Sequence, residues 1–342
     1  MLSLQRIFKS PSPGLIGVGA AVITVLIWTS FILIARASAD PARGGILTSF
    51  DLAFCRIVGA SLILLPWSWA LNRRDRAAGV VQSSLWGLSP LPLRVTLTAG
   101  LFGGLLYAML AYSGFAFAPA LYASVLMPGS LPLWTALLAA WLLRDRITLY
   151  RGLGLGLIVL GDLLVGGASL LRALDGGDVW KGDLLFMAAA SCWATYSVLA
   201  RRYALDAVRA TMAITAMAFV FYVPAYTVLL LTHLVDGHLL LARPGEVVFQ
   251  MVFQGWGSVV ISGITFTKMI QHFGPVRSTM ITALVPVLSA LGAVVFLGEP
   301  MQWNLFCGLA LVTAGIVFGV RAVALASEPK DARHSGTAPG RG

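Results

Sequence analysis

The chain has 342 residues, of which 58% are hydrophobic and only 11% carry a charge. A soluble globular domain has about 25% charged residues, so this chain cannot cover a water-facing surface and is expected to face lipid. Its 24 Lys and Arg residues outnumber its 14 Asp and Glu residues, but they stand in short clusters between apolar runs, which is typical of membrane proteins and argues against a nucleic-acid partner.

Ten apolar runs are long enough to cross a bilayer, whose hydrocarbon core needs about 20 helical residues. Lipid does not tolerate unpaired backbone, so each run is predicted to be a helix. The runs cover residues 15–35, 47–71, 95–116, 120–143, 152–171, 183–200, 210–232, 247–271, 276–297 and 303–320. The first run is longer than a signal-peptide core, which spans about 7–15 residues, and is expected to be retained.

The distribution of Lys and Arg predicts the orientation. With a cytoplasmic N-terminus, one side of the membrane collects 18 of these residues and the other side 5. This asymmetry predicts a multi-pass protein of the cell inner membrane with both termini in the cytoplasm. Residues 1–13 are then a cytoplasmic N-terminus, and the polar residues 322–342 a disordered cytoplasmic tail.

The two halves of the chain resemble each other. WTSFILIAR at 28–36 aligns with WATYSVLAR at 193–201, at an offset of 165. At an offset of 154, Pro132 aligns with Pro286, Asp145 with Glu299, Gly154 with Gly308 and Gly161 with Gly315. These matches predict repeats at 14–171 and 182–321, joined by a loop at 172–181. Five helices per repeat is an odd number, so the sequence predicts an all-α membrane protein of ten transmembrane helices in two inverted five-helix repeats, a design typical of secondary transporters.

Several stretches resemble the EamA family of the drug/metabolite transporter superfamily. They are LAFCR at 52–56, LLRDRIT at 142–148, GDLL at 182–185, CWA at 192–194, LVPV at 284–287 and FLGE at 296–299. The resemblance covers about residues 14–320 and implies a central cavity lined mainly by the first, third, fourth, sixth, eighth and ninth helices. Where the family usually reads Gly-Glu-Arg, this chain has Arg144-Asp145-Arg146.

Charged residues inside apolar runs are costly and are candidates for function. Lys268 is predicted either to bind an anionic group of a substrate or to reach the cytoplasmic surface beside His272. Arg56 is either an anion ligand or gate residue, or a structural residue paired with backbone carbonyls or a carboxylate. Asp162 is a candidate for proton coupling, and the alternative is a protonated or hydrogen-bonded structural residue.

Aromatic residues and prolines supply the other candidates. The candidate substrate-binding aromatic residues are Trp28, Tyr107, Tyr112, Tyr122, Trp193 and Tyr196, and the alternative role for such residues is anchoring at the membrane interface. Pro128, Pro132 and Pro286 interrupt helical hydrogen bonding and are candidate hinges or packing kinks. Glycine pairs, namely Gly100/Gly104, Gly152/Gly156 and Gly315/Gly319, predict close helix contacts, with a homodimer as one expectation.

These patterns favour a secondary transporter that exports a small amphipathic metabolite, amino-acid-like or drug-like, by alternating access. The alternatives are an integral membrane enzyme and a membrane protein without cargo. The three cysteines lie in apolar runs without metal-binding spacing, and the histidines lie in or beside predicted loops. No catalytic residue, metal site or cofactor is therefore predicted, and the expected partners are a small-molecule substrate and the lipid bilayer.

Overall fold

The computed structural model describes residues 13–80 and 83–327, and every regular element within these ranges is helical. The elements of the first half are α1 (Pro13–Ala39), η1 (Pro41–Arg43), α2 (Ser49–Ala77), η2 (Leu85–Gly87), α3 (Leu93–Gly100), η3 (Leu101–Leu106), α4 (Tyr107–Phe117), α5 (Ala120–Ser124), η4 (Val125–Gly129), α6 (Leu131–Leu143) and α7 (Leu149–Ala173). Those of the second half are α8 (Val179–Arg202), α9 (Ala207–Leu231), α10 (Pro244–Gln250), η5 (Met251–Ile261), α11 (Ser262–Thr282), α12 (Leu284–Leu297) and α13 (Trp303–Ser327). Elements η3, η4 and η5 are π-helical.

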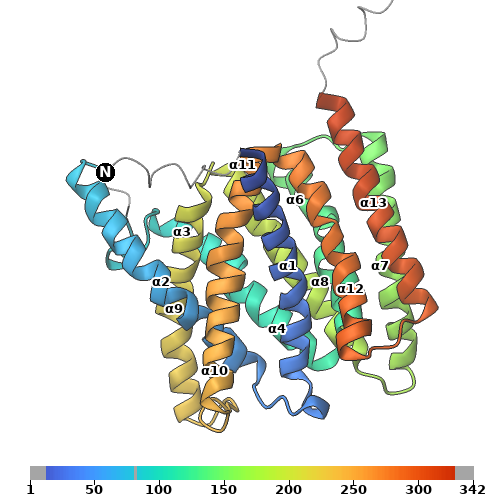
Figure 1. Cartoon of the computed structure of the whole chain (residues 1–342), viewed down its shortest axis with the longest axis horizontal. Coiled ribbons are helices and arrows are strands. Elements are labelled where there is room, and N and C mark those ends of the chain that lie inside the picture. Colours follow the sequence, from blue (N-terminus) through green and yellow to red (C-terminus); the bar gives the residue numbers. More distant parts are fainter. Residues whose placement is uncertain (1–12, 81–82, 328–342) are drawn as a thin grey trace, which may run out of the picture.

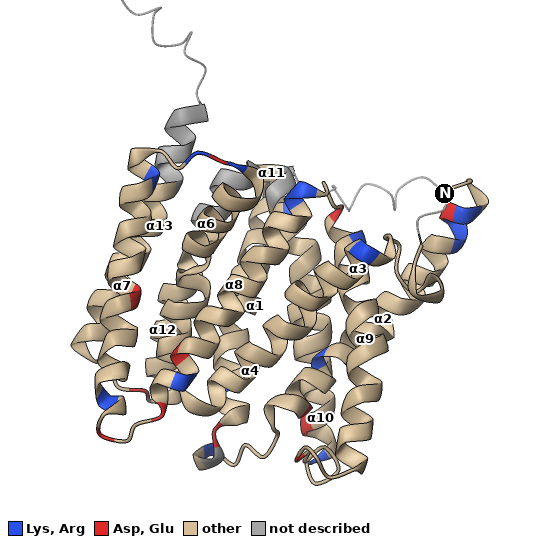
Figure 2. Cartoon of the chain, turned by 180° about the vertical axis from the view of Figure 1, so that it is seen from behind, with Lys and Arg blue, Asp and Glu red and all other residues tan. Residues whose placement is uncertain are grey.

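The helices have the length and composition of membrane spans. Eight stretches in the described part of the chain qualify: Gly14–Ala39, Ser49–Ala77, Leu93–Phe117, Ala120–Leu143, Leu149–Ala173, Val179–Arg202, Ala207–Leu231 and Pro244–Met269. Two shorter apolar helices, Leu284–Leu297 and Trp303–Gly319, follow them. Most charged residues gather at the two ends of the bundle and leave an apolar belt between them (Figure 2). The prediction of an all-helical membrane protein is therefore confirmed.

The helices stand side by side in one bundle, with α7 and α13 at one edge and α2 and α9 at the other (Figure 1). We call the end where α1 begins and α13 ends the upper end, and the end where α1 leads into α2 the lower end. In the middle of the bundle, α1 packs against α11 and α12, and α8 packs against α4 and α6. The contacts of α1 join the first half of the chain to helices of the second half, and the contacts of α8 join the second half to helices of the first. The two halves therefore interlock.

Glycines bring α7 and α13 into direct contact. A Cβ atom at Gly154 would lie 2.8 Å from the carbonyl oxygen of Gly315, and one at Gly161 would lie 2.7 Å from that of Gly308. The residue numbers rise along one helix and fall along the other, so the two helices run antiparallel. Among the predicted glycine pairs, Gly100 and Gly104 pack against α9, whereas Gly152 and Gly156 have open space within 4 Å.

Several helix boundaries differ from the sequence prediction, and α2, for example, continues to Ala77 instead of ending at residue 71. The gap expected at 272–275 is helical, because α11 continues to Thr282 and the helix is broken at Ala283 instead. Helix α13 continues to Ser327, beyond the predicted end of the second repeat at residue 321. In lipid a helix keeps its backbone hydrogen bonds internal. This favours continuation of the helix through residues that would end it in water. The predicted segment 1–13, apart from residue 13, and the predicted tail from residue 328 lie outside the described residues.

Helices α6 and α12 end in the same turn, although only one of them has the expected glycine. Arg144 has φ 57° and ψ 30°, and Gly298 has φ 61° and ψ 23°. In both turns the N–H of the next residue donates to the carbonyl oxygen of the residue six positions earlier. These hydrogen bonds run from Asp145 to Ala139 and from Glu299 to Ala293. Arg144 therefore adopts the left-handed conformation in spite of its side chain, a strain of roughly 1 kcal/mol.

The glycine contact predicts a position-dependent loss of stability. In Gly161→Val the new side chain meets the backbone of Gly308 and Val312, whereas in Gly156→Val the same side chain enters open space. Overpacking of a close contact typically costs about 1–3 kcal/mol. Thermal unfolding in detergent should show a clear decrease in melting temperature for Gly161→Val only. An equal change in melting temperature for the two variants would contradict the close packing of α7 on α13.

Candidate functional site

A cavity of about 680 Å³ lies in the middle of the bundle, and both halves of the chain line it. The first half contributes residues of α1, α2, η3, α4, η4 and α6, and the second half residues of α8, α9, η5, α11 and α12. Among the described residues, neither α7 nor α13 contributes to the lining. Volumes of about 300–1,000 Å³ are typical of small-molecule sites. The cavity is therefore the candidate substrate site.

Aromatic rings form two walls of this cavity. On one wall, the rings of Trp28 and Phe266 lie 5.2 Å apart, which joins α1 to α11. On the other, Trp193 of α8 lies 4.9 Å from Tyr107 of α4 and 5.3 Å from Tyr196. These ring pairs have the separations of favourable aromatic contacts. A flat or amphipathic molecule can contact aromatic faces from both sides.

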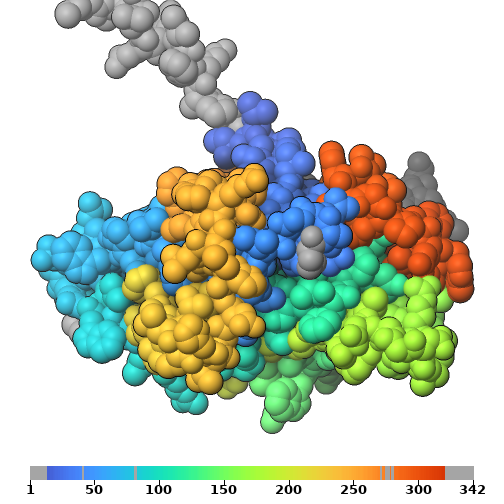
Figure 3. All heavy atoms as spheres, turned by 90° about the horizontal axis from the view of Figure 1, so that it is seen from below, coloured from blue at the N-terminus to red at the C-terminus, as the bar shows by residue number. Residues whose placement is uncertain are grey.

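The cavity is closed toward the lower end by buried aromatic side chains. Phe31 lines the cavity, and its ring lies 5.9 Å from that of Tyr112 and 6.3 Å from that of Phe115. Phe115 in turn lies 5.0 Å from Phe186, and all three rings behind Phe31 have no exposed surface. Figure 3 looks onto the lower end, where side chains of the α1–α2 and α4–α5 connections fill the middle of the face.

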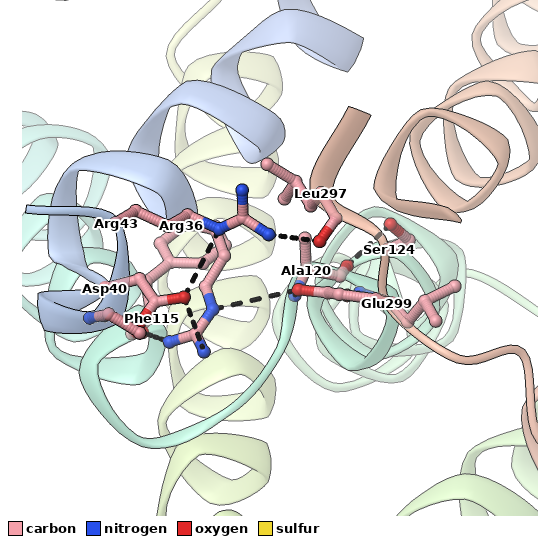
Figure 4. A network of polar contacts seen from close by, with 10 residues as sticks. Arg36, Asp40, Arg43, Phe115, Ala120, Ser124, Leu297 and Glu299 are labelled. Atoms are coloured by element: carbon pink, nitrogen blue, oxygen red, sulfur yellow. Dashed lines mark hydrogen bonds and ion pairs between the residues drawn. The ribbon is translucent and has the colours of Figure 1, made fainter. Parts of the chain in front are cut away.

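A polar network ties the same end together (Figure 4). Arg36 donates to the carbonyl oxygen of Phe115 at 2.7 Å, and its Nε lies 3.7 Å from the carboxylate of Glu299. That carboxylate also accepts the backbone N–H groups of Ala120 and Leu121, both at 2.9 Å. Burial raises the pKa of Glu299, although these donors and Arg36 oppose the shift. Glu299 thus joins α1, α5 and the end of α12.

A second ion pair lies at the upper end. The guanidinium of Arg201 contacts the carboxylate of Asp145 through two hydrogen bonds of 2.6 and 3.2 Å. The two side chains are 63% and 26% exposed, compared with 18% and 11% for Arg36 and Glu299. The cavity lining extends to Asp206 and Ala207, where α8 leads into α9 at this end. Asp206 is exposed, so the cavity is open to solvent at the upper end, whereas the buried rings behind Phe31 close it at the lower end.

The two ion pairs are related by the repeat that the sequence predicts. Arg36 aligns with Arg201, and Asp145 aligns with Glu299. Each pair joins an arginine from one half to a carboxylate from the other. The glycine contacts between α7 and α13 are exchanged between the halves in the same way. In the sequence, Gly154 aligns with Gly308 and Gly161 with Gly315. In the structure, Gly154 contacts Gly315 and Gly161 contacts Gly308.

The structure brings some of the predicted site residues into the cavity and leaves others outside. The predicted residues that line it are Trp28, Arg56, Tyr107, Pro128, Trp193 and Tyr196. Those outside its lining are Tyr112, Tyr122, Pro132, Asp162, Lys268 and Pro286. Lys268 is exposed, and its backbone carbonyl contacts the His272 ring at 2.9 Å. Tyr112 donates to Gln254 behind the cavity, and Tyr122 lies in a separate pocket of about 110 Å³ beside Glu299.

The predicted hinge prolines stand at helix interruptions. Pro128 lies within the π-helical η4, and Pro132 lies in the first turn of α6 just after it. Pro286 lies in the first turn of α12, after the break at Ala283. Residues beside both interruptions line the cavity, namely Leu131 in α6 and Val285 in α12.

The sequence did not single out several residues of the site. Phe31, Phe266 and a group of hydroxyl residues on α9, η5 and α11, including Thr211, Ser258 and Ser262, line the cavity. The roles of Arg36 and Glu299 at its closed end were also missed. The alignment of Arg36 with Arg201 and of Asp145 with Glu299 contained the signal, because charges conserved between repeats near helix ends are candidates for contacts between the halves.

Two buried carboxylates outside the cavity have oxygens without a hydrogen-bond partner among the described residues. Asp162 on α7 is 5% exposed, and within the described residues neither of its oxygens has a hydrogen-bond partner. Asp183 on α8 accepts a hydrogen bond from Ser169 through one oxygen, while the other is without a partner in the same part of the chain. Neither residue contacts the candidate substrate site directly.

Comparisons with known proteins agree with this architecture. The EamA-like transporter family matches residues 15–167 and 180–321. The chain is 24% identical over 193 residues to the "Uncharacterized transporter YyaM" of Bacillus subtilis (strain 168). That match covers 56% of this chain and 62% of the relative. A solved structure titled only "Crystal structure of protein" has the same fold, with a TM-score of 0.53, 23% identity, and coverage of 93% of this chain and 99% of that one.

The open cavity predicts a difference in thiol accessibility. Ser197 lines the cavity, whereas Ser289 is fully buried in α12 and does not. In a variant without native cysteines, Ser197→Cys should react with a polar maleimide that reaches the upper end, while Ser289→Cys stays unlabelled. Labelling of both or of neither cysteine would contradict a solvent path from the upper end into the bundle.

Proposed function

Because the chain belongs to the EamA-like transporter family, we propose that it is a secondary transporter that exports a small amphipathic metabolite by alternating access. The observation that carries this proposal is the cavity, which both halves line and which is open at one end and closed at the other. Access to a central site from one side at a time is what transport of this kind requires.

We further propose that the chain crosses the membrane ten times, as two inverted five-helix repeats. The eight long spans and two shorter apolar helices support this number, with the end of α11 and α12 together forming the ninth crossing. The antiparallel contact of α7 with α13 supports the inversion, because these helices hold equivalent places in the two repeats. The exchanged pairs Arg36–Glu299 and Arg201–Asp145 support it independently.

The proposed orientation places the upper end in the cytoplasm of a cell with an inner membrane. In this orientation 18 Lys and Arg residues lie on the cytoplasmic side and 5 on the other side, which supports this assignment. The cavity then opens to the cytoplasm, the side from which an exporter loads its cargo. Export itself rests on analogy with the family.

Proton coupling is proposed for Asp162, since its buried carboxylate has no partner among the described residues. A carboxyl group in such a place can take up and release a proton as its surroundings change. The homodimer expected from the glycine pairs has weaker support, because Gly154, Gly161, Gly308 and Gly315 are used within the chain. Gly152 and Gly156 are the pair that a second copy could contact.

A flux assay tests the proposed function. Purified protein is placed in liposomes that are loaded with a mixture of amino acids and other small metabolites, and the solutes that leave are identified by mass spectrometry. We expect saturable, protein-dependent exit of an unmodified solute. A chemically changed product would support a membrane enzyme instead, and no movement or change of any solute would support a protein without cargo.

The polar network at the lower end predicts a gating defect. In Glu299→Ala, the N–H groups of Ala120 and Leu121 and the guanidinium of Arg36 lose their shared acceptor. Leaving such donors unpaired costs about 1–3 kcal/mol each, so the closed end should open more often. A cysteine at Ala118, which has no exposed surface, should then react with a polar thiol reagent added from the lower side.

Asp178 provides the matched control. This residue belongs to the same end of the bundle and pairs at 2.7 Å with Lys181, but both side chains are exposed. Exposed pairs contribute about 0–1 kcal/mol, so Asp178→Ala should leave the cysteine at position 118 unlabelled. If Glu299→Ala and Asp178→Ala give the same labelling, the Glu299 network does not close the lower end.

A further inference from the structure

Arg56, a partly buried cation in the cavity wall, forms no ion pair with another of the described residues. Of the described residues that line the cavity, Arg56 and Asp206 are charged. The Arg56 guanidinium lies 5.6 Å from the centre of the Phe31 ring. Its Nη1 is buried and has no hydrogen-bond partner among the described residues. A partly desolvated charge with an unpaired donor is destabilising, so this arrangement favours the binding of an anion.

No carboxylate of the described residues forms an ion pair with Arg56. Asp51 lies on the same helix, but its oxygens accept hydrogen bonds from Thr48, from the Tyr226 hydroxyl and from the backbone N–H of His238. Asp206 lies at the upper end, where its carboxylate accepts the N–H of Arg209 and caps α9. Arg56 lies about two turns from the lower start of α2. Most of the membrane depth therefore separates Arg56 from Asp206.

The surroundings of Arg56 suit an organic anion better than a small inorganic one. The guanidinium lies at the floor of the cavity beside Phe31, and the aromatic walls of Trp28/Phe266 and Tyr107/Trp193 rise above it. A carboxylate fits the planar fork of an arginine through two parallel hydrogen bonds. A ring attached to that carboxylate would extend between the walls.

We propose that the cavity selects carboxylic acids with an aromatic body, with the carboxylate on Arg56 and the ring between the two aromatic walls. The hydroxyl of Ser258, the other buried polar group of the lining without a partner among the described residues, adds a hydrogen bond to the bound molecule. The proposal names the substrate class of the proposed transporter and rests on that function for its biological meaning. The binding step itself requires no transport.

Calorimetry on the full-length protein in lipid nanodiscs tests the proposal. The probes are 3-phenylpropanoate, its neutral amide 3-phenylpropanamide and the cation 3-phenylpropylamine, which share the ring and differ in charge. A hydrogen bond to a charged group contributes enough for a difference of about tenfold or more in affinity. We expect the acid to bind at least about tenfold more tightly than the amide, and the amine not to bind measurably.

Two variants of Arg56 separate the charge of this residue from its other effects. Arg56→Gln should abolish the preference for the acid over the amide, and Arg56→Lys should keep the preference with weaker binding. Ser258→Ala should weaken acid and amide by the same factor. Lys181→Gln, which removes an exposed cation paired with Asp178 outside the cavity, should leave both affinities unchanged. Thermal unfolding of each variant shows that it is folded.

Equal binding of acid and amide by the unaltered protein would overturn the proposal, as would an acid preference that survives in Arg56→Gln. The flux assay keeps this result separate from the proposed function. If no solute moves but the acid preference depends on Arg56, the anion site stands and the transporter proposal fails. If a solute without a carboxylate moves and no acid preference is found, transport stands and the anion site fails.

Discussion

Contacts exchanged between the two halves are the constraint on which the rest of the structure depends. Arg36 of the first half meets Glu299 of the second, and Arg201 of the second meets Asp145 of the first. The glycines of α7 and α13 repeat this exchange along a pair of antiparallel helices. With equivalent groups held against each other, the halves enclose a space in the middle of the bundle. The ion pair at the lower end, Arg36–Glu299, is less exposed than the ion pair at the upper end, Arg201–Asp145. This difference accounts for a cavity that opens on one side.

Much of the fold follows from the sequence because lipid leaves few options. Long apolar runs can only be helices where water is absent, so the all-helical membrane fold was predictable from composition and run length. The sequence left the turn at Arg144 open, because the family usually has a glycine there, and the structure shows that α6 and α12 end in the same way. Arg144 takes the left-handed turn that a glycine takes at position 298, so the geometry of the turn is kept where the residue type is not.

The rotation of helices about their own axes could not be predicted, and the site depends on it. A π-helical segment has more residues per turn than an α-helix, which shifts the face that later residues present. Helix α11 follows the 11-residue segment η5, and this helix places Phe266 in the cavity and Lys268 outside it. The importance of Arg56 was underestimated for a related reason, since α2 was not expected among the helices that line the cavity.

The central claim is that the two halves cross the membrane in opposite orientations, so that equivalent positions lie on opposite sides. Side-specific labelling of equivalent positions tests this claim most directly. Arg146 and Pro300 are equivalent at the offset of 154 and are both exposed. In variants with a single cysteine, a membrane-impermeant thiol reagent is applied to intact cells and to inverted membrane vesicles. The account predicts that Pro300→Cys reacts only in cells and Arg146→Cys only in vesicles. Reaction of both cysteines from the same side would contradict it.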